Sequence, residues 1–513
     1  MTRSGADVGA GLARARPART IPAGERIHVI GVAGAGASAA ASLAHFAGAR
    51  VSACDSGGPS PYTSGPALIG LPMEWRHGPD HVIADGVSRV DRLAVTKALT
   101  SIDPDHSELL AARGAGIPVE PWQQLVADVA ESRGQRLVAV TGTHGKSTCA
   151  GWLVHLLTSA GRDPAACVGA LLPARLTGGV PATARWGRGD TFVVEADEYA
   201  GNFDPFRPSV AVLLNVEWDH PDVFADEDAV VEAFARWTDA PGIEGRTVVA
   251  NVRDAGVRHV LERMRVPPQR LVRVALATVG EAGAGEAGAG EADLSGQLGE
   301  DGILSMSGPL LMQAGTLDVP LRLAGGHNAA NALAVAAASA VLGVEAGRIG
   351  QGLATFEGVG RRLELKGEPG GITVLDDYGH HPTAIAATLA AVRARYPGRR
   401  IWAVYEPLTY HRTAAMLERF ADVLATADQA VIADIWAGRD PDTSITSADR
   451  LATAIRRRGH APATAPGSVE ATADHLAGRV KPPDVVLVMG GGRSYVIAER
   501  LLVSLAERWP QNH

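Results

Sequence analysis

Short apolar runs recur along the chain, and many are followed by a turn rich in glycine or polar residues and then by a longer stretch with helical periodicity. In the clearest case, the run Leu137–Val140 leads into GTHGKST at 142–148, and Trp152, Leu153 and Leu156 follow on one helical face. Apolar runs of about four to eight residues are typical of buried strands, and apolar positions three and four apart are typical of helices. This alternation predicts repeated βα units and an α/β fold built on parallel sheets.

The same pattern divides the chain into three sheet-forming segments. Further predicted strands are Ile27–Val32, Arg50–Ala53, Thr191–Glu195, Val210–Asn215, Ile372–Leu375, Ile401–Tyr405, Gln429–Ile432 and Val485–Met489. They predict a Rossmann-like domain at 25–133, a central P-loop ATPase-like parallel sheet at 134–356 and a second Rossmann-like domain at 357–513. We expect residues 1–24, which have several arginines and no apolar core, to be a disordered tail, and the Gly/Ala/Glu repeat at 278–293 to be a flexible insertion.

Composition narrows the class of protein. The 513 residues, of which 46% are hydrophobic, can bury several cores, and the net charge of −8 argues against a broad nucleic-acid-binding surface. We find no signal peptide, and the most apolar long stretch, Ala329–Val344, is too short to span a membrane comfortably. Cys54, Cys149 and Cys167 lack CxxC spacing, which argues against a disulfide scaffold or a zinc site. We therefore expect a cytoplasmic protein without membrane or nucleic-acid partners.

The segment 142–148 has the residue types of a phosphate-binding loop. At a strand–turn–helix junction, backbone N–H groups and the positive helix end face an anion, Lys146 adds a full charge, and Ser147 offers a hydroxyl to Mg²⁺. The match to the full P-loop pattern is incomplete, because its first glycine would fall at Val140. An ordinary glycine-rich turn is the alternative, but the flanking strand and helix favour the phosphate loop.

A second glycine-rich turn follows the first predicted strand. Gly34, Gly36 and Ala39 fit the dinucleotide fingerprint, and Asp55 lies near the end of the next strand. The physical requirement is a phosphate at a helix N-terminus and a carboxylate for a ribose or base. NAD, FAD and a nucleoside-diphosphate sugar all meet this requirement, and a plain turn packed with small residues remains the alternative.

Polar residues follow several other predicted strands. Glu195 and His220 should emerge beside the phosphate loop, because the carboxyl ends of parallel strands line one crevice. A carboxylate is a natural Mg²⁺ ligand, whereas chemistry alone leaves His220 equally a ligand or a core histidine. Asn328 can cap the helix that it begins or hydrogen-bond a nucleotide base. The dense polar segment 376–381 (DDYGHH) is a candidate site, with a solvated turn as the alternative.

The order and spacing of seven motifs make the chain similar to the Mur ligases from about Ile27 to Leu502. The motifs are GVAGAGAS (31–38), GTHGKST (142–148), EADE (195–198), NVEWDH (215–220), GGHNAANAL (325–333), FEGVGRRLE (356–364) and DDYGHHPT (376–383). The resemblance implies a ligase of peptidoglycan synthesis that uses ATP and Mg²⁺ to join L-alanine to UDP-N-acetylmuramic acid through an acyl phosphate. It also implies a UDP-sugar-binding first domain, an ATP-binding central domain and a third domain that closes over ATP and the amino acid, in a monomer or homodimer.

The resemblance also assigns roles to individual residues. It implies ATP contacts from Gly142, Thr143, His144, Gly145, Lys146, Ser147, Thr148, Asn328, Arg362, Asp377 and Tyr378, Mg²⁺ ligation by Ser147, Glu195 and His220, and substrate contacts from Gly34, Ala35, Gly36, Ser38, Asp55, Tyr378, His380 and Arg412. The implied catalytic residues are Lys146, His220, Asp377 and His380. Arg412 resembles the arginine that holds the amino acid carboxylate.

The third segment departs from the family pattern. Glu406 and Leu408 replace a glutamine and a histidine, Thr409 stands where some members have a second arginine, and 490–492 reads Gly-Gly-Gly instead of Gly-Ala-Gly. The segments Glu195–Tyr199 and Arg361–Gly367 also resemble the related recycling ligase, which attaches a tripeptide to the same sugar nucleotide and is the second interpretation. Two interpretations from other classes are an NAD-dependent oxidoreductase, in which the Lys146 loop has no role, and a UDP-sugar-sensing binding protein without turnover.

Overall fold

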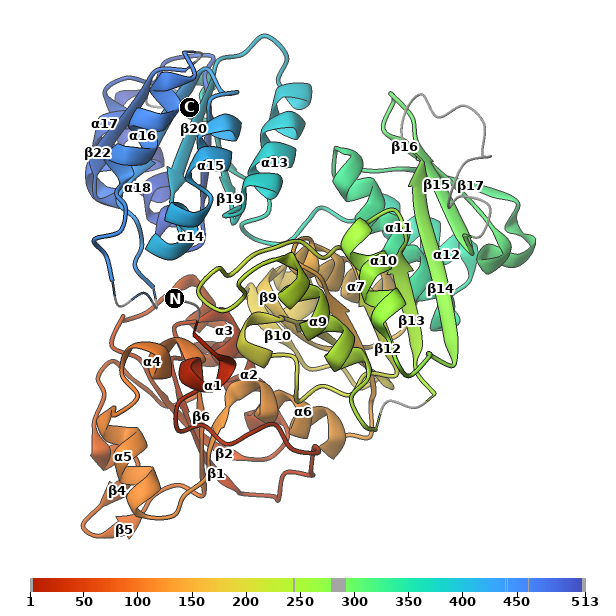
Figure 1. Ribbon diagram of the computed structural model, residues 1–513, viewed down its shortest axis with the longest axis vertical. Coiled ribbons are helices and arrows are strands. Elements are labelled where there is room, and N and C mark those ends of the chain that lie inside the picture. The colour runs from red at the N-terminus through yellow and green to blue at the C-terminus, as the bar shows by residue number, and fades with distance from the viewer. Residues whose placement is uncertain are drawn as a thin grey trace. The chain divides into compact units, whose positions relative to one another are not determined.

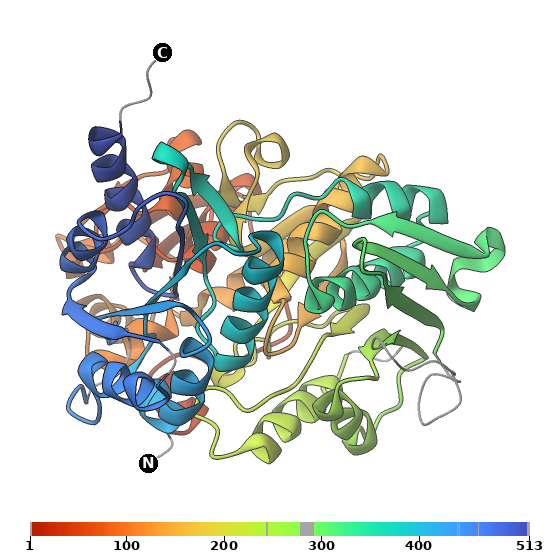
Figure 2. The same cartoon turned by 90° about the horizontal axis from the view of Figure 1, so that it is seen from above.

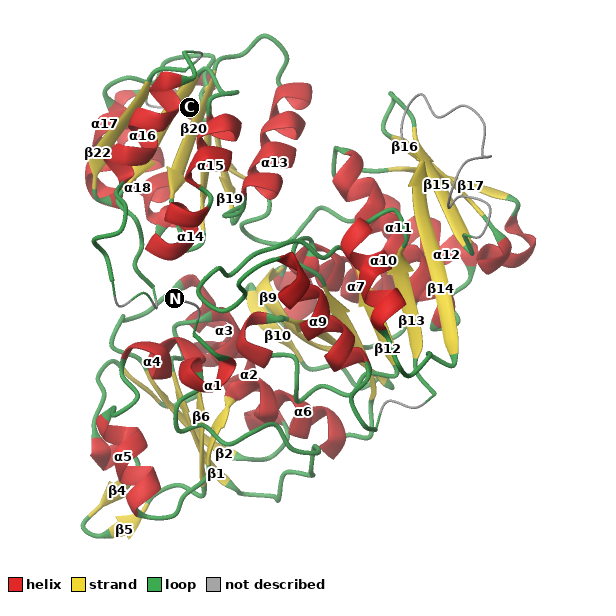
Figure 3. Ribbon diagram, viewed as in Figure 1, coloured by secondary structure: helices red, strands yellow, loops and turns green. Residues whose placement is uncertain are grey.

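The computed structural model describes residues 3–242, 245–277, 292–438, 440, 442–459 and 461–509. They form two compact units (Figure 1). The first comprises the chain up to Trp218 together with Val223–Gly360, and the second comprises Asp219–Asp222 together with the chain from Arg361 onward. Two large sheets belong to the first unit and one to the second, and helices flank each of them (Figure 3). The predicted α/β class with three parallel-sheet modules is confirmed. Within the described ranges, the structure has no helix long and apolar enough to cross a membrane.

The first sheet has five parallel strands in the order β3-β2-β1-β6-β7, which is a Rossmann-like arrangement. Its strands are β1 (Arg26–Ile30), β2 (Arg50–Cys54), β3 (Met73–Glu74), β6 (Arg92–Val95) and β7 (Val119–Pro121), and its helices are α2 (Ala35–Phe46), α3 (Ser64–Leu68), α4 (Lys97–Ile102), α5 (Ser107–Gly114) and α6 (Trp122–Ser132), with a hairpin of β4 (Ile83–Ala84) and β5 (Val87–Ser88). The turns that carry Gly34 and Asp55 follow β1 and β2, so they lie at the same edge of the sheet.

The second sheet has the order β10-β9-β11-β8-β12-β13-β14-β15-β16-β17, parallel from β9 to β15 and antiparallel at its ends. Its strands are β8 (Arg136–Thr141), β9 (Ala165–Leu172), β10 (Ala182–Arg185), β11 (Thr191–Ala196), β12 (Val210–Leu213), β13 (Thr247–Asn251), β14 (Arg270–Ala277), β15 (Leu294–Leu298), β16 (Ile303–Ser307) and β17 (Thr316–Pro320), and its helices are α7 (Lys146–Ser159), α8 (Ala174–Thr177), α9 (Glu227–Thr238), α10 (Ala255–Arg263), α11 (Gly326–Val341) and α12 (Ala346–Ala354). The green strands in Figure 2 include the antiparallel extension. Of the insertion predicted at 278–293, residues 278–291 lie outside the described residues.

One hydrophobic core joins the two sheets of the first unit. Helix α2 of the first sheet packs on β9 and β10 of the second. Ala41 of α2 and Leu137 of β8 belong to the same cluster of buried residues. The Ser38 and Thr183 hydroxyls, one from each module, lie 2.9 Å apart. The two sheets are therefore held together by apolar burial as well as by chain connection.

Residues 3–24 correct the expected disordered tail. They include a short helix, α1 (Gly5–Val8), and the side chain of Val8 is fully buried. Arg16 pairs with Glu120 at 2.7 Å and with Asp128 at 2.8 Å, and Ala13 N donates to Val119 O at 2.8 Å. The sequence pattern missed this segment because ion pairs and backbone hydrogen bonds hold it, and these leave no apolar periodicity.

The sheet of the second unit has the order β18-β19-β23-β20-β21-β22, with only β18 antiparallel to its neighbour among these six strands. Its strands are β18 (Glu364–Gly367), β19 (Thr373–Asp377), β20 (Ile401–Glu406), β21 (Gln429–Ala433), β22 (Ala463–Gly467) and β23 (Val485–Gly490), and its helices are α13 (Pro382–Arg395), α14 (Tyr410–Ala415), α15 (Leu417–Leu424), α16 (Ala448–Arg457), α17 (Val469–Ala477) and α18 (Ser494–Arg508). Helices α17 and α18 bury the face that includes Val404 and Val486, and α15 packs against both α13 and α16. The predicted parallel sheet of this segment is confirmed.

Candidate functional site

The segment 142–148 turns the chain between β8, a central strand of the second sheet, and α7. Gly142 has φ 143° and Gly145 has φ 81°, which glycine adopts without steric cost. A Cβ atom at Gly142 would lie 2.9 Å from Asn215 O, and one at Gly145 would lie 2.7 Å from Asn331 Oδ1. Both the backbone conformation and the neighbouring groups therefore require glycine at these positions.

Residues after β12 hold the loop in place. Thr143 N donates to Asn215 O at 3.0 Å, and His144 N donates to Asn215 Oδ1 at 2.7 Å. Glu217 N donates to Thr143 Oγ1 at 2.9 Å. Asn215 was part of a sequence motif but had no predicted role, and the structure shows that it holds the loop in place.

Lys146 is a half-buried cation at the start of α7. Its Nζ donates to Gly142 O at 2.6 Å and to Glu198 Oε2 at 3.1 Å. Burial would lower the pKa of Lys146, but the charges of Glu198, Asp197 and Glu195 outweigh it, so the pKa lies above its usual value. The ammonium group is therefore charged at neutral pH.

Ser147 and Glu195 form a pair of oxygen donors beside this cation. Ser147 Oγ donates to Glu195 Oε1 at 3.0 Å, and Gly169 N donates to Oε2 at 2.7 Å. Glu195 pairs in register with Val140 of β8, so its side chain comes from the strand next to the loop. Hydroxyl and carboxylate oxygens are the donors that Mg²⁺ prefers, and this pair fits that ion.

Asn328 lies in the first turn of α11 and is not its cap, because Gly325 occupies that position. Asn328 Nδ2 donates to Ala324 O at 2.8 Å, and Asn331 Nδ2 lies 3.5 Å from Asn328 Oδ1. Because Asn331 also approaches Gly145, the two amides reach toward the phosphate loop. Asn331 was missed as a site residue, although its spacing of three residues places it on the same helical face as Asn328.

The first glycine-rich loop is ordered by Asp55. Asp55 Oδ2 accepts a hydrogen bond from Ala33 N at 3.0 Å, and Oδ1 accepts one from Gly57 N at 2.7 Å. Gly34 is the N-cap residue of α2, and Ala35 is its first helical residue. The structure therefore brings Gly34, Ala35 and Asp55 together at the predicted anion-binding end of the helix.

Gly36 and Ser38 face the protein interior. A Cβ atom at Gly36 would lie 2.2 Å from Trp122 Cζ2, so glycine is needed there for packing against α6. Ser38 is fully buried, and its hydroxyl donates to Ala35 O at 2.9 Å and contacts Thr183. These contacts give both residues a role in packing, and their predicted substrate contact stays a prediction.

In the second unit, the segment after β19 is held by Asp377. Its Oδ2 accepts a hydrogen bond from Leu363 N at 2.8 Å and its Oδ1 accepts one from Gly379 N at 2.7 Å. The Arg362 guanidinium lies 5.0 Å from the centroid of the Tyr378 ring. Arg362, Asp377 and Tyr378, predicted as ATP contacts, are therefore neighbours.

His380 lies against Tyr378, with the two ring centroids 5.4 Å apart. His380 Nδ1 lies 3.0 Å from Tyr378 O. Burial and the nearby charge of Arg412 hold the pKa of His380 well below its usual value, so the imidazole is neutral at pH 7. This histidine can orient a polar ligand group but does not bring a positive charge.

Arg361 was missed by the sequence analysis, although it precedes Arg362. Its Nη2 donates to Gly490 O at 2.9 Å and to Ser494 Oγ at 2.8 Å, and its Nε lies 3.2 Å from Asp376 Oδ2. Burial raises the pKa of Asp376 to about 6, although Arg361 opposes the shift. Arg361 thus links the carboxyl ends of β19 and β23.

Arg412, Asp219 and His220 form a buried group within the second unit. Arg412 Nε donates to Asp219 Oδ1 at 2.7 Å, and Arg412 Nη2 lies 3.1 Å from His220 Nδ1. Burial would raise the pKa of Asp219, but Arg412 and His220 hold it well below its usual range. Asp219 was not predicted as a site residue, although it lies between Trp218 and His220 in a motif. His220 belongs to this unit, whereas Ser147 and Glu195 belong to the first.

Glu406, which departs from the family pattern, ends β20 in a buried position. Burial raises its pKa to about 7, although backbone hydrogen bonds from Ser494 and Arg493 oppose the shift. Its Oε2 atom has no hydrogen-bond partner within the described part of the chain. At pH 7 this side chain is therefore close to half protonated.

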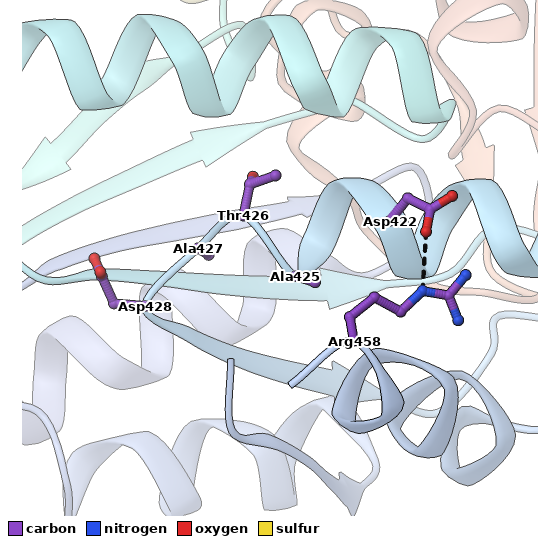
Figure 4. A pocket seen from close by; sticks show the side chains of 6 residues that line it. All are labelled: Asp422, Ala425, Thr426, Ala427, Asp428 and Arg458. Atoms are coloured by element: carbon purple, nitrogen blue, oxygen red, sulfur yellow. Dashed lines mark hydrogen bonds and ion pairs between the residues drawn. The ribbon is translucent and has the colours of Figure 1, made fainter. Parts of the chain in front are cut away.

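A shallow pocket on the second unit lies elsewhere (Figure 4). Its lining residues are Asp422, Ala425, Thr426, Ala427, Asp428 and Arg458, and Arg458 Nε donates to Asp422 Oδ1 at 2.9 Å. Residues 425–428 precede β21, so the pocket is at the amino end of the sheet, whereas the predicted site residues are at carboxyl ends. Ligands of open parallel sheets bind at carboxyl ends, and this pocket therefore carries none of the predicted chemistry.

Comparisons with known proteins agree with these features. Residues 140–339 match the Mur ligase middle domain, and residues 361–492 match the Mur ligase glutamate ligase domain. The UDP-N-acetylmuramate–L-alanine ligase of Frankia casuarinae is 36% identical over 82% of this chain and 84% of its own length. That of Roseiflexus sp. is 34% identical over 94% of this chain and 99% of its own length.

A solved structure also resembles the whole chain. UDP-N-acetylmuramate–alanine ligase from Thermotoga maritima has a TM-score of 0.73 at 20% identity and covers 94% of this chain and 99% of its own, which supports the fold. The two domain matches and the long alignments confirm the resemblance predicted from the seven motifs: the chain belongs to the Mur ligase family.

Proposed function

We propose that this protein is an ATP-dependent ligase that joins L-alanine to UDP-N-acetylmuramate through an acyl phosphate. The observation that carries the proposal is the phosphate loop, in which a half-buried, charged Lys146 lies beside the oxygen donors Ser147 and Glu195. The curated relatives with this named activity align with nearly the whole chain, which supports the choice of substrates.

The chemistry explains why a phosphate loop is needed. At neutral pH a carboxylate and an ammonium form a salt, because hydroxide is a poor leaving group. A carboxylate oxygen that attacks the γ-phosphorus of ATP displaces ADP and forms an acyl phosphate. The free amine of alanine then attacks the acyl carbon, the tetrahedral intermediate expels inorganic phosphate, and the amine gives up a proton. Both steps build negative charge on oxygen, which positioned cations and N–H donors stabilise.

We assign the residues of the first unit accordingly. Lys146 and the loop N–H groups of 142–148 contact the β- and γ-phosphates, with Asn328 as a further ATP contact. Ser147 and Glu195 would hold Mg²⁺, which neutralises phosphate charge when it is bound. The turn at Gly34 and Ala35, ordered by Asp55, receives the diphosphate of the sugar nucleotide.

We assign the amine end of the reaction to the second unit. Arg412, whose Nη1 has no hydrogen-bond partner among the residues described, is the proposed ligand of the alanine carboxylate. Arg362, Asp377 and Tyr378 are proposed nucleotide contacts, and His380 orients polar groups in its neutral form. His220 stays a proposed Mg²⁺ ligand. We further propose that the enzyme works where ATP is supplied, in the cytoplasm, as a monomer or homodimer.

A phosphate-release assay tests the proposal. The purified chain is mixed with ATP, Mg²⁺ and UDP-N-acetylmuramate, and single amino acids or the L-Ala-γ-D-Glu-diaminopimelate tripeptide are added one at a time. We expect phosphate release that depends on L-alanine, with a new amide product by mass spectrometry. Release with the tripeptide but not alanine would reassign the chain to the recycling activity. Nucleotide-sugar binding without ATP consumption for any amine would overturn the ligase proposal.

A further inference from the structure

A second group of reactive side chains lies in the first unit, outside the proposed active site. One ligand atom from each of His28, Cys54, His81 and Glu108 lies within 4.8 Å of the others, and all four residues are buried. They come from β1, β2, the short 3₁₀ helix η2 (Pro79–His81) and α5. Four elements that are distant in sequence therefore converge on one point.

Four of the six pairs among these residues are separated by distances close to the edges of a small tetrahedron, and the other two pairs, which both include His81, lie within 4.8 Å. His28 Nε2 lies 3.2 Å from Cys54 Sγ and 3.3 Å from Glu108 Oε2, Cys54 Sγ lies 3.5 Å from both Glu108 oxygens, and His81 Nδ1 lies 3.1 Å from Glu108 Oε1. Ligands about 2.0–2.3 Å from a tetrahedral Zn²⁺ are separated by about 3.3–3.8 Å. Only a small adjustment of the side chains would be needed to accommodate the ion.

The far sides of the two histidine rings are already hydrogen-bonded. His28 Nδ1 lies 2.8 Å from Ser52 Oγ, and His81 Nε2 lies 3.2 Å from Glu74 Oε2. Histidines that ligate metals nearly always bond their other ring nitrogen to a carboxylate, carbonyl or other polar group, which fixes the ring and the tautomer. The arrangement at His81 and Glu74 is the carboxylate–histidine pairing that supports zinc ligands.

Additional nitrogen donors surround the cluster. His77 Nδ1 lies 3.3 Å from both Cys54 Sγ and Glu108 Oε1. His106 packs against His77 with ring centroids 4.6 Å apart, is 8% exposed, and its Nδ1 has no hydrogen-bond partner in the described portion of the chain. His77, His106 and Glu108 each offer a ligand atom within 4.8 Å of the others, so the surroundings of the cluster also suit a cation.

We propose that His28, Cys54, His81 and Glu108 bind one Zn²⁺ ion in a structural site. One sulfur, two nitrogens and one carboxylate oxygen suit this borderline-soft ion, and four protein ligands leave no open coordination position for catalysis. The sequence argued against zinc because the cysteines lack CxxC spacing, but here the ligands come from separate segments. The inference does not depend on the ligase activity.

The site would fix the edge of the first sheet that carries the nucleotide-sugar loop. His28 and Cys54 lie in neighbouring strands, and Cys54 directly precedes Asp55, which orders that loop through Ala33 N. Binding at the cluster would tie these strands to α5 and η2. We therefore expect the metal to stabilise the first unit without entering the reaction.

Metal analysis and cobalt spectroscopy of the full chain test the proposal. Protein purified from zinc-supplemented medium should contain about one zinc per chain. Replacement of zinc by Co²⁺ should give a thiolate-to-cobalt charge-transfer band, which surface histidines alone cannot produce. A strong chelator should lower the thermal midpoint of the wild-type protein.

Two matched pairs of variants locate the site. Cys54→Ser should abolish the charge-transfer band and the response to chelator, whereas Cys167→Ser, which removes another buried thiol, should keep both. Glu74→Gln should weaken zinc binding about 10–100-fold by removing the carboxylate behind His81. Its control, Asp80→Asn, removes the other acidic partner of Arg76 and should leave zinc affinity unchanged.

Wild-type protein that takes up neither zinc nor cobalt and shows no chelator effect would overturn the proposal and leave a hydrogen-bonded histidine–carboxylate network. Bound cobalt without a thiolate band would overturn it as well. If Cys54→Ser does not fold, the cobalt spectrum of the wild type and the zinc affinity of Glu74→Gln still test whether the cluster binds zinc.

Discussion

At the scale of single residues, the candidate site is made of buried charges whose partners set their protonation. Lys146 stays charged because three carboxylates outweigh its burial, whereas His380 is neutral because burial and the charge of Arg412 act in the same direction. For Glu406, burial outweighs the opposing charges of Arg361 and Arg493, and its pKa rises to about 7. Three buried or half-buried ionisable groups in one protein thus reach different charge states, because each has different charged neighbours.

Lys146→Ala should reduce turnover about 10²–10³-fold, because it removes one preorganised charge from the transition state. It also removes the ion pair between Lys146 and Glu198, which is 1% exposed, so thermal stability should fall too. Turnover and the thermal midpoint are therefore measured together. The double variant Lys146→Ala/Glu198→Gln should regain stability but not turnover, and exposed Lys481→Ala should change neither. Wild-type turnover in Lys146→Ala would remove this residue from the mechanism.

Glu406→Gln should change how stability depends on pH. The folded protein holds the pKa of Glu406 at about 7, above the 4.5 of an exposed glutamate, so the folded state favours the neutral acid. The stabilisation that protonated Glu406 gives the folded state is complete below about pH 4.5. It is lost as the pH rises through 7, and the free energy of unfolding falls by up to about 3 kcal/mol. Glu406→Gln should remove this loss and be more stable than wild type above pH 7, as measured by urea unfolding across pH. Exposed Glu499→Gln is the control, and parallel wild-type and Glu406→Gln profiles would contradict the shift.

At the scale of elements, the two ends of helix α7 show which constraints come from the local backbone and which come from tertiary contacts. Glycines with positive φ lie at both ends, Gly145 at 81° and Gly161 at 79°. A Cβ atom at Gly145 would meet Asn331 at 2.7 Å, whereas one at Gly161 would meet nothing within 4 Å. Both positions need a residue that adopts positive φ, but only Gly145 also lacks space for a side chain, because of Asn331.

This difference gives a matched pair of variants. Gly161→Ala should cost about 1 kcal/mol from the left-handed backbone alone and leave nucleotide affinity unchanged. Gly145→Ala should cost more and weaken binding of a non-hydrolysable ATP analogue about tenfold or more, because Asn331 and the loop must shift. Calorimetric titration and thermal unfolding measure the two effects. Equal nucleotide affinity in both variants would show that the loop tolerates the shift.

At the scale of the whole molecule, three large sheets are organised into two compact units. The first two sheets share a core through α2, β9 and β10, and the third has its own core between its strands and helices α17 and α18. Shared apolar burial couples the unfolding of the elements that contribute to it. The number of sheets therefore need not equal the number of folding units.

Scanning calorimetry of the full chain should show two transitions, not three. Glu406→Gln at pH 8 should raise only the transition of the second unit, and a nucleotide-sugar ligand should raise the transition that contains both sheets of the first unit. Thr183→Val, which removes the hydroxyl bonded to Ser38, should lower only that same transition. Three resolved transitions would show that the first two modules unfold independently.

The sequence by itself determined the local features. The strand β8, the turn at 142–148 and the helix α7 follow from an apolar run, glycines and helical periodicity, all of which act between residues close in the chain. The α/β class and the three large sheets were predicted from the same periodic patterns, and the family was predicted from the order and spacing of short motifs. The proposed roles of Lys146, Ser147 and Glu195 come from this level together with the family resemblance, and they stay predictions to be tested by assay.

Only the tertiary structure decided which distant residues meet. It placed Asn215 against the phosphate loop, Asp219 against Arg412 and Arg16 against Asp128, and it turned Ser38 inward. It also brought Cys54 together with three residues from other segments, and no spacing in the sequence predicts this cluster. The physical reason is that strand order and helix packing, set by burial over the whole unit, fix these contacts, whereas sequence periodicity reports only which face of one element is apolar.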